Sequence, residues 1–589
     1  MAKPWTKPYI LQRWEYSRDR KMEYFDSNAK INYNYYDGTG HWSEAEKKIL
    51  AADERPATVL NYVFKLVNTF VGNEIQNRND IHAFPMEGGD VAMANILNYG
   101  YKHVKSNTRL DWKFTQAHVD GLISSQGWLM NRIKFDRQGR PVIDIKNKNP
   151  LMIYFDPDSI ELDLSDAQDV FESEFVFKPE LIKKFPAMKK EIESFCSVDI
   201  DDHQVYYDRK KDLVRVLYAE YMKFEKQPYY VIRLKNGGFR YQKEEPKRGE
   251  IPTGATVTVD HDTVAQSYGM RFLGDVVLEE PIKNPYGCGN DKFSYTLIAP
   301  YFVAGRGVSI VNQFRSMQDM INKSYSQAID ILNRQPKVGG LYEEGALEDP
   351  DELDEIARSG KWLPVKNIEK IKILDPPDYP VAHMRLLADT IDYIKEIVGT
   401  PDVFMGEAPG RVESALGIQI LKRQAGLTFE MPADNLRLGQ IEVGRKIMNQ
   451  MSEFWSRDKF MRVAGEDGNY QEINIKPAQI KMTKTDREGK PVGEPSTLTN
   501  RLREGEYDFV IDVTQPTVTQ RMHNQMIATQ LFQMIPRPEL APLLIDMLDF
   551  PQKDKWKQAL GQAAEAMAEQ QASGGQGGPQ GGQGGQGGV

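Results

Sequence analysis

The stretch GVSIVNQFRSMQDMINKSYSQAIDILN, residues 307–333, decides how the rest of the chain is interpreted. Its apolar side chains recur at roughly helical intervals, and no proline or glycine interrupts its interior. We therefore predict one long helix here. A second helix is predicted over 381–398, and a small insert, residues 336–378, separates the two. We expect the helices to run antiparallel, with Ile321 and Ile391 in one core and the insert at their far tip.

The insert is predicted to combine a short helix with strands. Asp349-Pro350 followed by Glu352 is typical of a helix N-terminus, because proline fits the first turn and acids face the positive end of the helix dipole. Residues 361–365 and 368–374 are predicted to be strands on the far side of that helix.

The second helix is followed by a loop rich in glycine and proline, residues 399–410. Helical periodicity then resumes over 414–455, a length of about 60 Å if straight, and Pro432 is expected to kink this helix. Residues 460–513 return to β patterns, with 507–513 as the clearest strand. The C-terminal part is predicted to form helices and then a disordered Gly/Gln tail, over 517–535, 538–548, 553–570 and 571–589 respectively.

The N-terminal half mixes helices and strands, which predicts an α+β body up to about residue 300. Residues 1–50 are rich in Tyr, Trp, Lys and Asp and are expected to form an arm with short helices. A helical pattern over 59–71 is interrupted at Gly72, and another over 112–124 is closed by Gly127. One further helix is predicted over 91–104, and strands over 128–135, 142–145, 152–155, 213–222, 229–234, 239–241, 276–278 and 293–298.

Charge and composition narrow the function classes. The net charge of −9 argues against tight nucleic-acid binding, which needs a basic surplus, but not against a passage through which DNA slides. The sequence contains no run of about 18 apolar residues, the length needed to span a membrane. We therefore expect no membrane partner. The N-terminus does not resemble a secretory signal. Cys196 and Cys288 lie far apart in the sequence, which favours a reducing compartment over a disulfide scaffold.

Strong catalytic motifs are absent from the sequence, so we predict a protein that is not an enzyme and has no cofactor. Gly489-Lys490 lacks the upstream glycine of a phosphate-binding loop, and the eight histidines show no metal-ligand spacing. The best acidic candidate is Asp156-Pro157-Asp158. Its carboxylates suit Mg²⁺ in a metal-dependent nuclease or other DNA-packaging enzyme. The alternative is a solvated turn after the strand over 152–155.

Four local motifs occur in order around the central layout. They are a strand ending in Asp-Pro within 149–158, a Gln-Asp-x-x-Asn-Lys segment at 318–324, Glu-Ser-Ala-Leu-Gly-Ile-Gln at 413–419, and a strand-then-helix segment at 507–521. Together they resemble the portal proteins of tailed double-stranded-DNA phages over about residues 50–550. Gly417 and Pro432 depart from the pattern, which affects the boundaries of the loop before the long helix.

The resemblance implies a fold that is α+β, mainly helical, and portal-like, with wing, stem, clip and crown regions. The implied regions are an N-terminal arm (1–50), wing (51–304), first stem helix (305–335), clip (336–378), second stem helix (379–398), tunnel loop (399–413), long kinked wing helix (414–457), wing β segment (458–516), helical crown (517–570) and disordered tail (571–589).

The resemblance also implies a function: a ring, usually of twelve copies, at one capsid vertex of the virion, assembled in the host cytoplasm. Double-stranded DNA would be packaged and ejected through the central channel. The implied partners are further copies of this chain, the large terminase subunit, head–tail adaptor proteins, and the major capsid and scaffolding proteins. A ring with cyclic symmetry requires each subunit to offer two different faces.

The implied tunnel loop would line the channel, where its acidic excess would repel phosphate and let DNA slide. An ordinary helix–helix connection is the alternative. Its candidate residues are Asp402, Phe404, Met405, Glu407, Arg411 and Glu413.

The implied clip is strongly acidic and would dock the packaging motor or an adaptor by attracting a basic face. A solvated helix with acids near its N-terminus is an alternative compatible with docking. The acids are Glu343, Glu344, Glu348, Asp349, Asp351, Glu352, Asp354 and Glu355.

Basic residues of the first stem helix are candidates for DNA contacts. Lys323 and Arg334 lie on nearly the same helix face, with Arg315 roughly a quarter-turn away. The alternative, slightly favoured, is a set of inter-subunit salt bridges to Asp319 or Asp330.

Overall fold

The computed structural model describes residues 5–76, 78, 80–85, 91–194, 213–233, 238–242, 246, 251, 255–274, 276–334, 340–342, 371–373, 381–398, 429–455, 459–464, 470–475, 479–485, 496–499 and 507–512. By their contacts they fall into two units: residues 1–74 with 104–455, and residues 75–103 with 456–589.

The first unit begins with a helix that is longer than the short helices predicted for the N-terminus. α1 (Lys7–Lys21) continues through a π-helical turn, η1 (Met22–Asp26), into α2 (Ser27–Asp37). Gly38, with φ +84°, ends the run in the left-handed conformation that glycine adopts without strain. The other helices are α3 (Glu44–Ala52), α4 (Tyr62–Gln76), α6 (Leu110–Ser124), α7 (Lys178–Lys184), α8 (Lys189–Ser194), α9 (Ile310–Arg334), α11 (Val381–Val398) and α13 (Glu430–Phe454), with 3₁₀ turns η2 (Pro150–Met152) and η3 (Pro186–Met188).

Two antiparallel sheets form the β part of this unit. The first has the order β10-β2-β3, and the second β4-β5-β6-β8-β9 with β7 paired to β6. Their strands are β2 (Gly127–Phe135), β3 (Pro141–Lys148), β4 (Ile153–Phe155), β5 (Asp169–Phe177), β6 (Leu213–Arg233), β7 (Phe239–Gln242), β8 (Thr256–Leu273), β9 (Val276–Lys283) and β10 (Tyr295–Ile298). A short ladder joins β11 (Phe302–Val303) to β12 (Arg306–Gly307).

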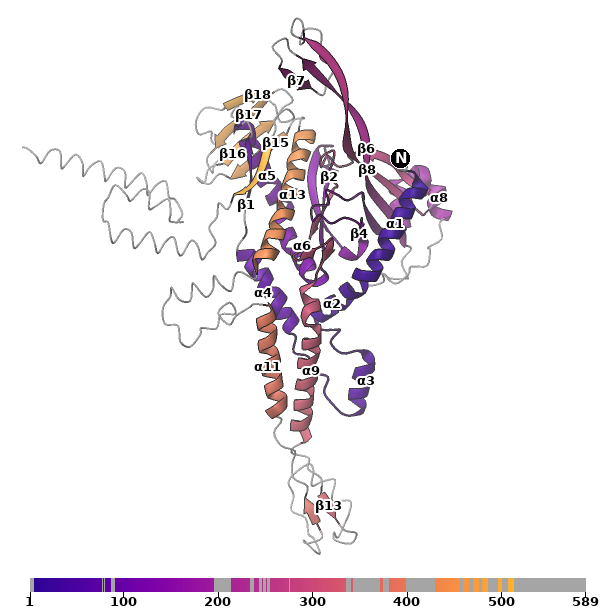
Figure 1. Ribbon diagram of the computed structural model, residues 1–589, viewed down its shortest axis with the longest axis vertical. Coiled ribbons are helices and arrows are strands. Elements are labelled where there is room, and N and C mark those ends of the chain that lie inside the picture. Colours follow the sequence, from indigo (N-terminus) through magenta and orange to yellow (C-terminus); the bar gives the residue numbers. More distant parts are fainter. Residues whose placement is uncertain are drawn as a thin grey trace, which may run out of the picture. The chain divides into compact units, whose positions relative to one another are not determined.

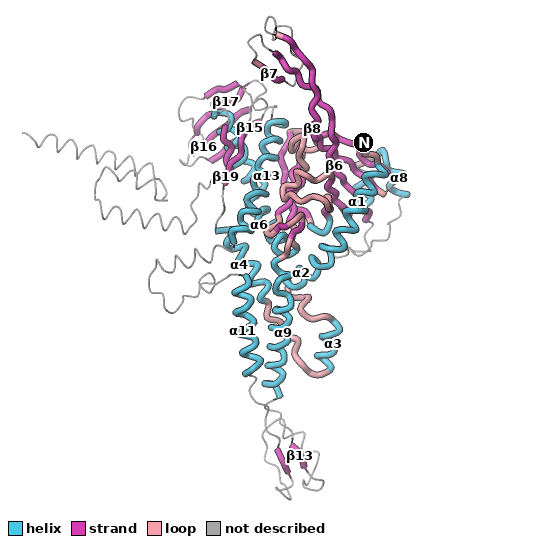
Figure 2. The backbone as a smooth tube through the Cα atoms, viewed as in Figure 1, coloured by secondary structure: helices cyan, strands magenta, loops and turns pink. Residues whose placement is uncertain are grey.

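The long strands β6 and β8 differ most from the sequence prediction. The two strands predicted over 213–222 and 229–234 are one continuous strand, and β8 was not predicted. The register runs from Leu217↔Phe272 to Arg233↔Thr256, so the polar stretch of β6 is held by its partner strand (Figure 2). Tertiary pairing here outweighs the weak local strand propensity of Lys, Gln and Pro.

Two glycines predicted to stop helices do not do so. α4 continues through Gly72 to Gln76, so this glycine is no stop signal. A Cβ added at Gly72 would meet no other atom within 4 Å. α6 ends at Ser124, as predicted, but the residue that closes it is Ser125, whose φ is +84°, and not Gly127. Gly127 instead begins β2, and a Cβ there would lie 1.8 Å from the carbonyl oxygen of Ala117. It is glycine because α6 and β2 approach closely.

The middle of the chain contains the two long helices that the sequence predicted to run antiparallel. The predicted helices over 307–333 and 381–398 are confirmed as α9 and α11, which lie side by side (Figure 1). Between them in sequence, β13 (Gly340–Tyr342) pairs with β14 (Ile371–Ile373) in antiparallel register. α13 begins at Glu430, so Pro432 lies in its first turn, where no intrahelical N–H bond is lost. The helix predicted near residue 349, the strand over 361–365 and residues 414–428 lie outside the described residues.

The described residues of the second unit lie mainly in strands. α5 (Val91–Thr108) begins in this unit, and Arg109, with φ +53°, separates it from α6. The strand predicted over 507–513 is confirmed as β19, which pairs with β1. The strands are β1 (Asp80–Pro85) with β19 (Tyr507–Asp512), and the four-stranded sheet of β15 (Lys459–Ala464), β16 (Tyr470–Ile475), β17 (Gln479–Thr485) and β18 (Ser496–Thr499). Residues 517–589 lie outside the described residues.

Candidate functional site

An apolar core joins α9 and α11. Ile321 and Ile391 belong to the same cluster, as the antiparallel arrangement requires. The Thr390 hydroxyl also lies 3.5 Å from the Met320 sulfur, across the two helices. α4 and the end of α6 complete the core with Val63, Leu66, Val67, Phe70, Leu122 and Ile123. Burial of these side chains fixes the helix pair to the α+β body.

The segment that leads into α4, residues 56–62, runs along one face of α9 and is held by its side chains. The backbone N–H groups of Thr58, Leu60 and Tyr62 donate to Ser326 Oγ (3.1 Å), Asn322 Oδ1 (3.0 Å) and Gln318 Oε1 (3.0 Å), respectively. The three N–H donors are two residues apart, and their acceptors are four residues apart, about 6 Å along a helix, so every second N–H meets one side chain per helical turn. We call this the 56–62 ladder.

The ladder is closed by further hydrogen bonds. Gln318 Nε2 donates to the Leu60 carbonyl (2.7 Å), and Ser326 Oγ donates to the Pro56 carbonyl (2.6 Å). Asn322 Nδ2 lies 2.9 Å from His41 Nδ1, while His41 Nε2 lies 2.9 Å from the Tyr35 carbonyl oxygen. Because Asn322 Nδ2 is a donor, His41 must accept at Nδ1 and donate from Nε2. Burial lowers the pKa of His41, consistent with this neutral imidazole.

The predicted stem cations contact the N-terminal segment of the same chain. Arg315 donates to Asn28 Oδ1 (3.1 Å), and Lys323 lies 3.9 Å from Glu46. Of the acids named as inter-subunit partners, Asp319 accepts from the Tyr35 hydroxyl (2.7 Å) and Asp330 lies 3.7 Å from Arg55. Arg334 ends α9, and its side chain lies outside the described residues.

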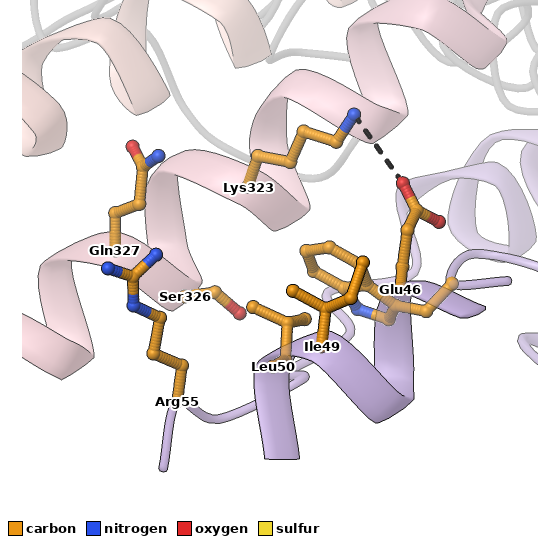
Figure 3. A pocket seen from close by; sticks show the side chains of 8 residues that line it. Glu46, Ile49, Leu50, Arg55, Lys323, Ser326 and Gln327 are labelled. Atoms are coloured by element: carbon orange, nitrogen blue, oxygen red, sulfur yellow. Dashed lines mark ion pairs between the residues drawn. The ribbon is translucent and has the colours of Figure 1, made fainter. Parts of the chain in front are cut away.

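A pocket of about 220 Å³ opens between α3 and α9 beside Lys323. Figure 3 shows Ile49 and Leu50 from α3 facing Ser326, with the Lys323–Glu46 pair at one end and Arg55 at the other. Its polar lining groups are engaged by the protein itself, since Ser326 Oγ donates to the Pro56 carbonyl and Lys323 lies beside Glu46. The volume is below the range usual for small-molecule sites. The pocket is therefore interpreted as a gap in the packing of α3 on α9.

The face of the helix pair away from the ladder is apolar and exposed. Leu386, Tyr393 and Ile397 are spaced by seven and four residues, so they share one face of α11. Their exposures are 46%, 61% and 55%, and that of Met320 on α9 is 45%. Met320 lies about 200° around α9 from Asn322, hence on the side opposite the ladder. We call these four side chains the exposed stripe.

The acidic residues considered for metal binding are engaged by the protein itself. Arg13 lies 2.8 Å from Asp156 and 2.6 Å from Asp169. Asp156 also accepts from the backbone N–H groups of Asp158 and Gln168, and Asp158 accepts from the Tyr16 hydroxyl. Burial raises the pKa of Asp169 to about 6 against the opposing hydrogen bond from Arg13. These carboxylates fasten α1 to β4 and β5.

Across the described ranges, no group of three or more His, Cys, Asp or Glu side chains could hold a metal ion. In the same part of the chain no helix is both long and apolar enough to cross a bilayer. The tunnel-loop candidates at 402–413 and the acids at 343–355 lie outside the described residues, so their roles stay predictions.

The chain matches the model of the phage P22-like portal protein family over residues 11–586, nearly its whole length. It belongs to this family. No curated protein matches the chain. Portal-family proteins are structural and generally not enzymes, and the mixed helices and sheets seen here are compatible with the predicted α+β class.

The ladder was the part of this portal-family chain that sequence reasoning missed. Gln318 and Asn322 drew attention only as part of a family-like motif, and nothing in residues 56–62 marked them as partners. The available signal was indirect: polar Gln318, Asn322 and Ser326 recur every four residues directly beside the apolar, buried Val311, Phe314 and Ile321. Such a polar stripe on a buried face needs hydrogen-bond partners.

Proposed function

We propose that this chain forms a ring at one vertex of a phage capsid and serves as the conduit for packaging and ejection of double-stranded DNA. The α9–α11 pair carries the proposal, because the pair has an insert between its helices in sequence and one face covered by its own chain. Membership of the portal family supports the same function. We assign α9 and α11 to the stem and residues 336–378 to the clip.

The exposed stripe supports assembly into a ring. Contiguous exposed apolar side chains usually mark a surface that a partner covers. In a cyclic ring each subunit presents two different faces to its neighbours. We propose that the exposed stripe of one copy packs on the ladder side of the next, where α4 exposes Phe64. This gives Leu386 and Tyr393 an assembly role.

The remaining roles follow from the resemblance and stay proposals. The acidic clip would dock the large terminase subunit and head–tail adaptors. Other surfaces of the ring would contact the major capsid and scaffolding proteins. The loop over 399–413 would line the channel. Replacing Glu407 and Glu413 by Lys should then impair DNA packaging while rings still assemble, because the channel would attract phosphate. Normal DNA filling by that variant would remove the pore-lining role.

Negative-stain imaging of the purified full-length protein tests the proposal. Rings with a central hole are expected, and counting their rotational symmetry gives the subunit number, for which twelve is the family expectation. Monodisperse monomers under assembly conditions would contradict the proposal. A nuclease assay with Mg²⁺ and the Asp156→Ala variant separates the enzymatic alternative, which requires cleavage that the variant loses.

A further inference from the structure

The β2–β3 hairpin projects beyond its sheet as a two-stranded ribbon. β10 pairs only with Gly127–Met130 of β2, whereas β3 accompanies β2 up to Phe135↔Pro141. A turn over 136–139 joins the two strands, with Gly139 at φ +73°. Within the described residues, the ribbon over 132–144 has neighbouring strands on neither edge.

This ribbon is basic in an acidic protein. Residues 132–146 contain five Arg or Lys residues and two Asp residues, a net charge of +3, while the whole chain carries −9. The five cations are Arg132, Lys134, Arg137, Arg140 and Lys146. A local reversal of the chain's charge is the electrostatic sign of a surface for an anionic partner.

One carboxylate holds two of these cations side by side. Asp144 Oδ2 lies 2.7 Å from Arg132 Nε and 2.7 Å from Lys134 Nζ. Burial opposes ionisation of Asp144, but hydrogen bonds from Lys134 and Arg132 outweigh it and lower its pKa. The single negative charge of Asp144 thus positions the two positive charges of Arg132 and Lys134. The three side chains together keep a net positive charge.

Lys146 adds a further cation near Arg132 and Lys134. It is exposed, and within the described part of the chain it forms no ion pair. It lies two residues after Asp144 in β3, hence on the same face, and opposite Met130 at the base of the ribbon. Burial and, after it, the charges of Arg132, Lys148 and Lys134 lower the pKa of Lys146, so these cations repel one another. A bound anion would relieve that repulsion.

We propose that the β2–β3 ribbon contacts the sugar-phosphate backbone of duplex DNA. The major groove of B-DNA, about 12 Å wide, admits a two-stranded β-ribbon. Cations on alternate residues of one strand are spaced by about 6.7 Å, which distributes charge along the ribbon as a linear polyanion requires. A protein partner would need an apolar interface core, and the only large apolar side chains exposed among the ribbon residues are Phe135 and Val142.

The proposal rests on the proposed function for the presence of duplex DNA, but it names a surface separate from the predicted channel loop. Binding through a few phosphate contacts is weak, independent of sequence and strongly dependent on salt. Such contacts suit a protein that must hold DNA without trapping it.

The test is fluorescence anisotropy of a short labelled duplex with the full-length protein over a series of salt concentrations. The key variant is Lys146→Gln, which removes a cation without breaking an ion pair. Its matched control is Lys190→Gln on α8, also exposed and with the same charge change. The slope of log affinity against log salt should become shallower by about one unit for Lys146→Gln and stay unchanged for Lys190→Gln. In the double variant Lys134→Gln with Lys146→Gln, this slope should become shallower by about two units. The double variant Lys134→Arg with Lys146→Arg should retain the wild-type slope.

Equal slopes for Lys146→Gln, Lys190→Gln and wild type would overturn the proposal. So would a wild-type protein that binds no duplex at about 50 mM salt, or displacement of the duplex by poly-glutamate as effectively as by unlabelled DNA. Failure of this proposal can be told apart from failure of the proposed function. Rings that bind no duplex through the ribbon would overturn only this inference, whereas duplex binding by protein that never forms rings would contradict the conduit alone.

Discussion

The two faces of the α9–α11 pair differ in what covers them: one contacts the same chain and the other is exposed to solvent. The ladder face is polar and buried, and the hydrogen-bonding groups of Gln318, Asn322 and Ser326 are matched one by one to backbone groups of the same chain. The exposed stripe is apolar and has no such match, because Leu386 and Tyr393 are open to solvent. Hydrogen bonds with fixed geometry specify one partner, whereas apolar surface accepts any complementary one.

This difference separates folding from assembly. Breaking the ladder should destabilise the single chain, since a buried polar group without a partner is costly. Changing the exposed stripe should leave the chain folded and affect only what packs on it. Variants on the two faces should therefore have opposite consequences.

The largest effect is expected from charging the exposed stripe. Leu386→Asp combined with Tyr393→Asp would bury two carboxylates in the proposed subunit contact, where ionised groups lose solvation. Rings should disappear from negative-stain images and light scattering should report monomers, with little change in melting temperature. Ile160→Asp with Val303→Asp, two exposed apolar sites elsewhere, is the matched control and should assemble normally. Rings formed by the stripe variant would show that the stripe is not an interface.

The next largest effect is expected within the ladder. Asn322→Ala removes buried hydrogen bonds to Leu60, Gln318 and His41. At about 1 kcal/mol for each bond, local stability should fall by roughly 3 kcal/mol. Amide hydrogen exchange at Leu60 and Thr58 measures that loss directly. Gln327→Ala, on an exposed position of the same helix, should change exchange at these amides little; equal effects of both variants would show that the ladder does not hold the segment.

A smaller effect is expected from acid. Burial lowers the pKa of His41, so the folded state favours the neutral ring and binds fewer protons than the unfolded chain. The ladder is therefore fully stable above about pH 6.5 and loses stability as the pH falls through the lowered pKa. Protonation at Nδ1 removes the acceptor for Asn322. Exchange at Leu60, corrected for its intrinsic pH dependence, should accelerate by at most about tenfold per pH unit. His41→Asn should abolish that acceleration, and an unchanged pH profile in this variant would assign the effect to another group.

The sequence predicted the helices of this region well and their partners poorly. α9 and α11 follow from apolar periodicity, because their packing faces are regular and long. The 56–62 segment has no comparable pattern, since its backbone pairs with side chains more than 250 residues away. The continuity of β6 between its two predicted strands, and the whole of β8, were missed for the same reason: pairing, and not local composition, makes these residues strands. For Arg315 and Lys323 the sequence suggested DNA contacts or inter-subunit salt bridges, whereas the structure places Asn28 and Glu46 of the same chain beside them.

The smallest effect is expected at Lys323, which lies between the two faces. Its ammonium group is 3.9 Å from Glu46, and both side chains are largely exposed, at 57% and 43%. Exposed ion pairs of this kind contribute at most about 0.5 kcal/mol because water and salt screen them. Lys323→Ala should therefore leave the melting temperature and the ring population nearly unchanged. If the variant instead weakened duplex binding in the anisotropy assay as much as Lys146→Gln does, the predicted DNA contact of α9 would be supported and the ion pair would be secondary. Unchanged binding would assign Lys323 to holding α3 against α9, the role that its position at the rim of the pocket favours.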